Sequence, residues 1–216
     1  EINENAVENF RLTGASLTGR HFPLRISVLK TGSDESRSYS VICRDVTERQ
    51  ETEKRLKKLA HFDSLTGLAN RATFNDRLVD SVKNSVRYDH KIALIFIDLD
   101  NLKPVNDHFG HRGGDILLRA VANRLKVSIR DTDLVARIGG DEFTIILSET
   151  AEHALPDLNV ISERLLKQIK EPLKIGAEIV EPSASIGITI SSSNDPDELV
   201  RHADIAMYKA KQDGKG

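Results

Sequence analysis

Leu134-Val-Ala-Arg-Ile-Gly-Gly-Asp-Glu-Phe-Thr-Ile-Ile-Leu147 contains two apolar segments separated by a pair of glycines. The segments Leu134 to Ile138 and Phe143 to Leu147 flank Gly139-Gly140, a spacing that predicts a β-hairpin with a tight turn. Asp141-Glu142 follows the glycines directly. Because glycine has no side chain, phosphate or ribose could approach the backbone closely at this turn.

A second apolar run, Ile92 to Ile97, predicts a buried strand that ends at Asp98-Leu-Asp100. If this strand neighbours the hairpin, Asp98 converges with Asp141 or Glu142. Such a carboxylate cluster suits a hard cation with oxygen ligands, Mg²⁺ above all. Either acid alone would more simply be a solvated residue of a turn. Together, after two apolar strands and beside two glycines, they favour a metal-phosphate site.

Helices and strands alternate over the rest of the C-terminal region. Apolar residues at helical spacing predict helices, and the apolar stretch from Ser185 predicts a strand. A last helix begins at Asp195-Pro196, with proline in its first turn. The expected helices cover about residues 74–86, 116–125, 155–169 and 196–210. This pattern predicts an α/β (α+β) fold, with a ferredoxin-like or palm-type central sheet flanked by helices.

The N-terminal region has a different character. Alternating apolar and polar residues predict strands at Phe22 to Leu29 and Tyr39 to Val46. Residues 47 to 62 lack glycine and proline and predict a helix, which Thr47 could cap. Its thin apolar stripe fits a solvated linker and a short dimeric coiled coil about equally. We therefore divide the chain into residues 1–48, a linker helix at 49–62 and a main domain at 63–216.

The composition of the chain excludes several classes of protein. The chain has 216 residues, 39% hydrophobic and 30% charged, with a net charge of −2. A non-specific nucleic-acid binder would need a basic excess, so we expect no nucleic-acid partner. The single cysteine excludes an internal disulfide, and no apolar run reaches the ~20 residues of a spanning helix. We expect a cytoplasmic fragment of a longer protein, and whether that parent is anchored to a membrane stays open.

Four motifs together resemble one known family. The stretch from Arg137 to Phe143 resembles the signature of GGDEF domains. Asp98 to Asp115, Asp63 to Arg71 and Ala203 to Lys211 resemble three further segments of that family, in the same order. The resemblance covers about residues 60 to 216. It implies a diguanylate cyclase, which joins two GTP molecules into cyclic di-GMP and releases two pyrophosphates.

The resemblance also implies roles at the carboxylate cluster. Asp98, Asp141 and Glu142 would bind Mg²⁺, or Mn²⁺ in its place, together with the backbone carbonyl of Leu99. Asp141 and Glu142 would be the catalytic residues. Glu142 would lie beside the attacking ribose hydroxyl, either as a metal ligand or as a general base.

Matching positions imply a GTP site. Asn106 and Asp115 would read guanine, because an amide and a carboxylate complement its Watson–Crick edge. The remaining implied GTP-binding residues are Leu102, Lys103, Gly139, Gly140, Lys211 and Lys215. Leu102 stands where the family often has Phe, Pro104 stiffens the loop, and Lys215 stands where Arg is usual. None of these departures removes an expected metal ligand.

Arg130 and Asp133 resemble the family's RxxD inhibitory site, because they lie shortly before Gly139. That site binds the product cyclic di-GMP, since an arginine pairs bidentately with phosphate and stacks on guanine. The simpler interpretation is an exposed ion pair. Arg137, in the signature itself, could serve structure or the nucleotide.

Several alternatives accompany this interpretation. Catalysis would need a homodimer, with one GTP held by each domain. Instead, the domain could bind GTP or cyclic di-GMP and regulate an adjacent phosphodiesterase domain, or act only in dimerisation. The segment from Asn101 to Asp107 resembles GGDEF domains that are followed by such a phosphodiesterase domain. Residues 1–48, together with the segment Arg44-Asp-Val-Thr-Glu-Arg49 at their end, resemble the last strands of a PAS sensor domain.

Overall fold

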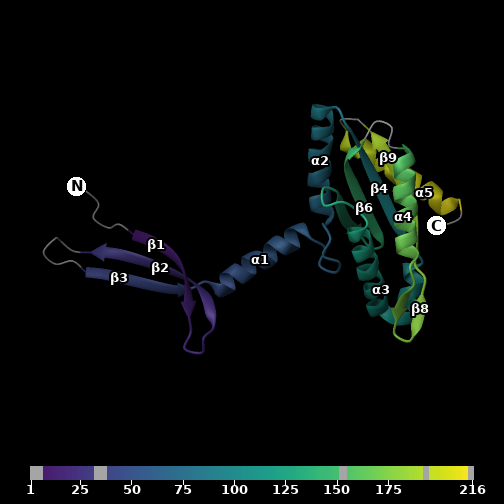
Figure 1. The fold of residues 1–216 in the computed structure, drawn as a ribbon. Coiled ribbons are helices and arrows are strands. Elements are labelled where there is room, and N and C mark those ends of the chain that lie inside the picture. Colours follow the sequence, from purple (N-terminus) through teal and green to yellow (C-terminus); the bar gives the residue numbers. More distant parts are fainter. Residues whose placement is uncertain (1–6, 32–37, 151–154, 192–194, 214–216) are drawn as a thin grey trace. The chain divides into compact units, whose positions relative to one another are not determined.

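The structure is a computed structural model that describes residues 7–31, 38–150, 155–191 and 195–213. It divides into two compact units, Glu1–Lys58 and Leu59–Gly216. Figure 1 shows their elements in chain order. Among the described residues, no helix is both long and apolar enough to cross a bilayer.

The first unit contains a three-stranded antiparallel sheet. Its strands β1 (Val7–Ala15), β2 (His21–Thr31) and β3 (Ser38–Asp45) follow one another in the order β1-β2-β3. The two strands expected from the sequence correspond to β2 and β3, whereas β1 was not identified from its pattern. That this sheet belongs to a PAS domain stays a prediction.

Helix α1 (Thr47–His61) follows the sheet and has no buried residue. Its apolar residues Leu56 and Leu59 are exposed. The expected cap is corrected in one respect. Thr47 is the first helical residue, and the Asp45 carboxylate accepts hydrogen bonds from its backbone N–H, at 2.8 Å, and from its hydroxyl, at 2.6 Å. Asp45 therefore caps the helix, because its acceptor reaches the free donors of the first turn.

The second unit is built on a four-stranded antiparallel sheet with the order β5-β6-β4-β9. These strands are β4 (Lys91–Asp100), β5 (Leu134–Gly139), β6 (Glu142–Thr150) and β9 (Ser183–Ser191). The β5–β6 hairpin and the buried strand β4 confirm two predicted elements, and β4 pairs with β6, which was the condition for the acids to converge. A separate small hairpin, β7 (Leu173–Ile175) with β8 (Glu178–Val180), was not anticipated, because three residues are too few to show a pattern.

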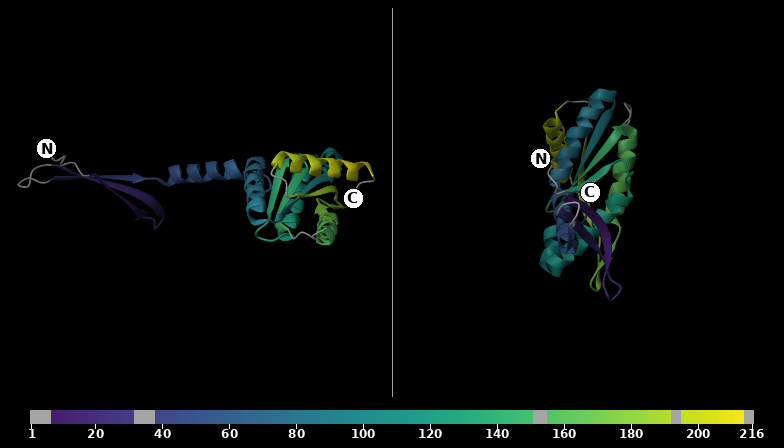
Figure 2. Two further views of the ribbon diagram at one scale, coloured as in Figure 1. Left: turned by 90° about the horizontal axis from the view of Figure 1, so that it is seen from above. Right: turned by 90° about the vertical axis from the view of Figure 1, so that its left-hand side faces the viewer.

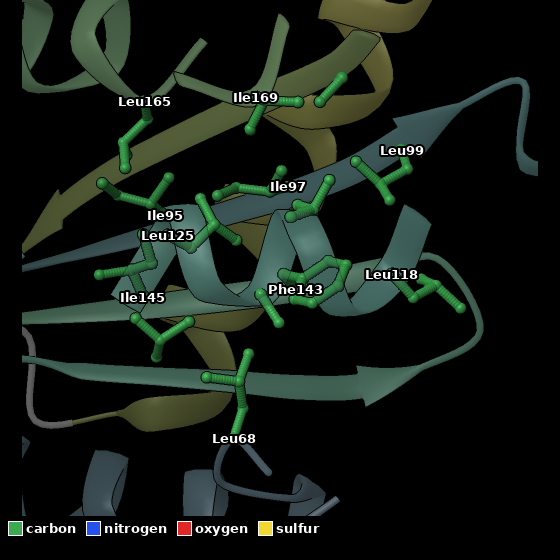
Figure 3. Close-up of a cluster of buried hydrophobic side chains, with 14 of the residues drawn as sticks. Leu68, Ile95, Ile97, Leu99, Leu118, Leu125, Phe143, Ile145, Leu165 and Ile169 are labelled. Atoms are coloured by element: carbon green, nitrogen blue, oxygen red, sulfur yellow. The ribbon is translucent and has the colours of Figure 1, made fainter. Parts of the chain in front are cut away.

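Helices cover both faces of this sheet, as the sequence predicted. They are α2 (Arg71–Tyr88), α3 (Leu102–Val127), α4 (Leu155–Lys170) and α5 (Pro196–Gln212). One apolar cluster joins α3 and α4 to one face, where Ile95, Ile97 and Phe143 are almost wholly buried (Figure 3). The other joins α2 and α5 to the opposite face. Figure 2 (left) shows α5 and α4 on opposite sides of the sheet.

Alternation along β4 decides which side chains meet which helices. Odd-numbered Ile95 and Ile97 face α3 and α4, whereas Leu94 and Phe96 face α2 and α5. By the same period of two, Asp98 belongs to the α2–α5 face. The polar end of the strand is thus directed to the side on which α5 packs.

Gly187 in β9 lets α5 approach the sheet closely. A Cβ atom at this position would collide with the backbone of Met207 and the carbonyl oxygen of Ala203. Met207 is buried, and Lys211 lies one helical turn further along α5. Residues four apart share one face of a helix, so the close approach at Gly187 also brings Lys211 towards the sheet.

We predict that Gly187→Ala destabilises the second unit by about 1–3 kcal/mol, because helix backbone cannot move aside as a flexible side chain can. Chemical denaturation measures the change. Thr189→Ala on the same strand and face is the control and should cost less, since it removes atoms from a partly exposed position. Equal stability of Gly187→Ala and the unaltered chain would contradict the packing described.

Candidate active site

The ends of β4 and β6 bring acidic residues together. Asp98 is the register partner of Glu142, and the Leu99 N–H donates to the carbonyl oxygen of Asp141 at 3.1 Å. Directly opposed residues of antiparallel strands have Cβ atoms about 5 Å apart. The convergence expected from the sequence is therefore present, on the face covered by α2 and α5.

Several acidic groups lie close together at the ends of β4 and β6. Burial, together with the neighbouring charges of Asp141 and Asp100, raises the pKa of Asp98 above its usual value even though Lys211 opposes the shift. Burial and the nearby Asp98 likewise raise the pKa of Glu142. A cation placed here would stabilise the ionised carboxylates.

Lys211 supplies one such cation. Its Nζ lies 2.7 Å from Oδ2 of Asp98, with side chains 33% and 9% exposed respectively. Burial alone would lower the pKa of Lys211, but the hydrogen bond to Asp98 and the acidic surroundings raise it. The sequence pointed to Lys211 as a candidate phosphate ligand but could not show that it contacts Asp98.

Asp100 is a further buried acid that we did not assign a role from the sequence. Its two carboxylate oxygens accept hydrogen bonds from the hydroxyls of Ser183 and Ser185, each at 3.1 Å. Both serines belong to β9, where they are register partners of Asp100 and Asp98. The acid thus has its own donors, and these bonds tie β9 to the end of β4. Only strand pairing could reveal this contact, since the residues are more than eighty positions apart.

The donor set has the chemistry that Mg²⁺ requires, although it is not a complete cage. Within the described parts of the chain, no three acidic, histidine or cysteine side chains are already grouped to hold a metal. Mg²⁺ commonly takes one or two carboxylates and completes its shell with water and substrate phosphate. Asp98 and the hairpin acids fit a site of that kind.

The candidate guanine-reading residues lie around a break in α3. Gly110 has φ +70° and ψ 173°, which interrupts the helix between Asn106 and Asp115. The Asn106 side chain packs against Gly114, where any Cβ atom would collide with its amide oxygen. Asn106 and Asp115 are both partly exposed, so a ligand can reach them. Lys103 is exposed and Leu102 partly buried at the start of this helix.

The Arg130–Asp133 segment is a structured turn. The Asp133 N–H donates to the Arg130 carbonyl, and the Asp133 carboxylate accepts from the N–H groups of Arg130, at 3.2 Å, and Ser148, at 3.4 Å. The simpler alternative, an exposed ion pair between the two side chains, is not among the contacts found for these two described residues. Instead, the acid organises the turn and the Arg130 side chain remains exposed.

Two arginines hold the hairpin turn. Arg137 donates to the Gly140 carbonyl oxygen, at 3.0 Å from Nε and 2.7 Å from Nη2, and to both carboxylate oxygens of Asp63. Arg71 donates from Nε to the Ile138 carbonyl, at 3.0 Å, and its Nη2 lies 4.0 Å from Glu142. Arg137 therefore has a structural role in this state. The motif Asp63 to Arg71 contained these partners, but its spacing alone could not pair them with the turn.

Not every expected site residue can be placed. Lys215 lies outside the described residues. Gly139 and Gly140 are exposed at the turn beside Asp141, and Gly140 has φ +42°.

The family model described as "Diguanylate cyclase, GGDEF domain" matches residues 60–216. The chain belongs to the GGDEF family. The fold agrees with solved GGDEF structures, for example the coiled coil and GGDEF domain of DgcB from Caulobacter crescentus in complex with c-di-GMP. That comparison has a TM-score of 0.71 at 26% identity and covers 78% of this chain and 90% of the other.

Curated GGDEF relatives carry two kinds of name. The "Bifunctional diguanylate cyclase/cyclic di-GMP phosphodiesterase MucR" of Pseudomonas aeruginosa is 42% identical, over 75% of this chain and 24% of its own length. The "Cyclic di-GMP phosphodiesterase PdeR" of Escherichia coli is 38% identical, over 91% of this chain and 30% of its own length. The chain thus spans less than a third of either relative.

The Asp63–Arg137 pair should contribute to stability in a pH-dependent way. Burial would raise the pKa of Asp63, but hydrogen bonds from Thr66 and Arg137 outweigh it and hold the pKa below its usual value. The stabilisation is therefore present above the unfolded-state pKa, near 3.8, and is lost as pH falls through the lower folded-state value.

We predict that Arg137→Gln lowers the free energy of unfolding at pH 7 by roughly 1–2 kcal/mol, because the pair is only partly buried. The difference between wild type and variant should shrink below pH 4. Urea unfolding of Arg137→Gln, Asp63→Asn and the double variant forms a cycle that isolates the pair. Additive single effects at pH 7 would contradict a direct interaction.

Proposed function

We propose that this domain is a diguanylate cyclase that condenses two GTP molecules into cyclic di-GMP. The proposal is carried by the opposition of Asp98 and Glu142 across β4 and β6, beside the exposed Gly139-Gly140 turn. Membership of the GGDEF family and the name of the MucR relative support it.

Asp98, Asp141 and Glu142, with the Leu99 carbonyl, would hold Mg²⁺ or Mn²⁺. When bound, such a dication neutralises charge on the α-phosphate and lowers the pKa of the attacking ribose hydroxyl. Glu142 would accept the proton of that 3′-hydroxyl as its oxygen forms a bond to the α-phosphorus and the bond to pyrophosphate breaks.

Asn106 and Asp115 would select guanine. Both flank the Gly110 break in α3, which leaves their polar groups accessible. A carboxylate accepts from the ring N–H and the exocyclic amine of guanine, an arrangement that adenine does not offer. Leu102 would pack beside the nucleotide. Lys103, Lys211 and Lys215 would meet the triphosphate, and the two glycines would let it approach the turn.

Catalysis would need two domains. A single site holds one GTP, whereas the product joins two nucleotides through two phosphodiester bonds, so two protomers would face each other. The exposed Leu56 and Leu59 of α1 provide an apolar stripe that could pair two copies. This stripe is short, and we expect weak association by the helix alone.

Regulation by the product would use the Arg130–Asp133 turn. The exposed guanidinium can pair with phosphate and stack on guanine, and the Asp133 bonds keep the turn in shape.

A non-catalytic role is the second candidate. The name of the PdeR relative, matched over 91% of this chain, supports a GGDEF domain that binds GTP or cyclic di-GMP and regulates an adjoining phosphodiesterase domain. Such a C-terminal domain would lie in the rest of a longer parent protein. The acidic cluster at the strand ends favours catalysis over this alternative, because nucleotide binding alone does not require it.

We predict that Glu142→Gln abolishes conversion of GTP to cyclic di-GMP, because the amide can neither accept the proton nor bind the dication as a carboxylate does. Incubation with GTP and MgCl₂ followed by chromatography measures the product. Glu163→Gln, at an exposed position of α4, is the matched control and should retain activity. A wild-type domain that binds GTP but forms no product would support the regulatory alternative.

We predict that cyclic di-GMP lowers the initial rate of the wild-type domain and that Arg130→Ala largely removes this inhibition. The reason is loss of the guanidinium that would pair with phosphate. Initial rates over a series of product concentrations give the inhibition constant, and circular dichroism checks that the domain remains folded. Equal inhibition of both proteins would place the inhibitory site elsewhere.

A further inference from the structure

The ion pair between Lys211 and Asp98 has a consequence for metal binding. Lys211 Nζ contacts Oδ2 of Asp98 at 2.7 Å, in a position where the lysine side chain is one-third exposed and the aspartate almost buried. The acid can neither turn away into water nor rely on serine donors, which serve Asp100 instead. Lys211 is therefore its principal counter-ion in this state.

Arg71 is poorly placed to replace Lys211 as the counter-ion of Asp98. Its Nε is engaged by the Ile138 carbonyl and its Nη2 reaches only to 4.0 Å from Glu142. The lysine ammonium, by contrast, sits on a flexible four-carbon stem and can move several ångströms without disturbing the helix. Met207, one turn earlier on α5, is buried and anchors the helix to the sheet.

We propose that Lys211 is a resident counter-ion that a divalent cation displaces from Asp98, and that the freed ammonium then binds the triphosphate. The inference rests on the proposed metal-dependent function. A Mg²⁺ ion bound about 2.1 Å from an Asp98 oxygen would repel an ammonium group on the same carboxylate. The two cations therefore compete, and metal binding releases Lys211 at the moment when a phosphate ligand is needed.

This competition couples binding of the divalent cation to binding of GTP. Free metal binds weakly because it must displace Lys211, and GTP alone binds weakly because Lys211 is held by Asp98. Whichever ligand binds first breaks the Lys211–Asp98 ion pair, so the second ligand no longer has to. The affinity of each ligand therefore rises when the other is bound. A protein with this arrangement favours the metal–nucleotide complex over either component.

The test measures binding of MnCl₂ without nucleotide, from the electron paramagnetic resonance signal of free Mn²⁺. Mn²⁺ is a suitable probe because it takes the same oxygen ligands as Mg²⁺. Lys211→Met removes the charge at similar side-chain length, and Lys211→Arg keeps it. Lys209→Met, at an exposed position of the same helix, is the control for loss of one surface charge.

We expect Lys211→Met to bind Mn²⁺ roughly three- to ten-fold more tightly than wild type, the range for loss of a partly buried competing pair. Lys211→Arg and Lys209→Met should stay near wild type. The same Lys211→Met variant should bind an α,β-methylene analogue of GTP more weakly in the presence of Mn²⁺. A merely structural role for Lys211 would weaken both ligands together.

Equal Mn²⁺ affinity of Lys211→Met and wild type overturns the inference, as does the absence of Mn²⁺ binding in every variant. Formation of cyclic di-GMP by the wild-type domain is assayed separately. If product forms while Mn²⁺ affinity is unchanged by Lys211→Met, the exchange is wrong and the proposed function stands. If wild type binds Mn²⁺ but forms no product, the proposed function fails while the exchange can still be judged.

Discussion

The antiparallel pairing of β4 with β6 is the constraint on which the site depends. It places Asp98 opposite Glu142 and connects Leu99 to Asp141 through a backbone hydrogen bond. Residues 92–100 of β4 and 143–147 of β6 are buried, so the register of the pair is held by apolar packing on two faces. A slip by one residue would turn Asp98 towards α3 and α4 and separate the acids from Lys211. The core thus positions the polar residues at the strand ends.

The hairpin turn needs a second form of support, because its glycines have little conformational preference of their own. Arg137 and Arg71 supply it by binding the carbonyls of Gly140 and Ile138. Asp63 completes this arrangement, since it holds Arg137 from the start of the domain. The backbone beside Asp141 is therefore preorganised by residues that are distant in sequence. Such preorganisation is valuable for phosphoryl transfer, in which positioning and charge stabilisation dominate catalysis.

The carboxylates at the ends of β4 and β6 are the feature of the fold on which the proposed chemistry depends. Packing places several carboxylates in a partly buried position, which raises the pKa of both Asp98 and Glu142. The close approach of α5 at Gly187 then brings Lys211 to Asp98. A single lysine neutralises this cluster only in part, and its side chain can move. The arrangement fits a site in which a dication and a nucleotide arrive together.

Much of this could be read from the sequence because the responsible signals are local. Period-two and apolar runs predicted β4 and the β5–β6 hairpin, and the motifs identified Asp98, Asp141 and Glu142 together. Other features depend on contacts between distant segments. The Arg137–Asp63 and Lys211–Asp98 pairs, the serine donors to Asp100 and the approach of α5 at Gly187 have no local pattern, since each forms only when strands and helices pack. The sequence by itself determined the longer helices and the strands of the central sheet, but not β1 or the β7–β8 hairpin, and it determined which residues could carry charge. Tertiary structure decided which of those charges meet, because pairing register and helix packing set their distances and their exposure to water.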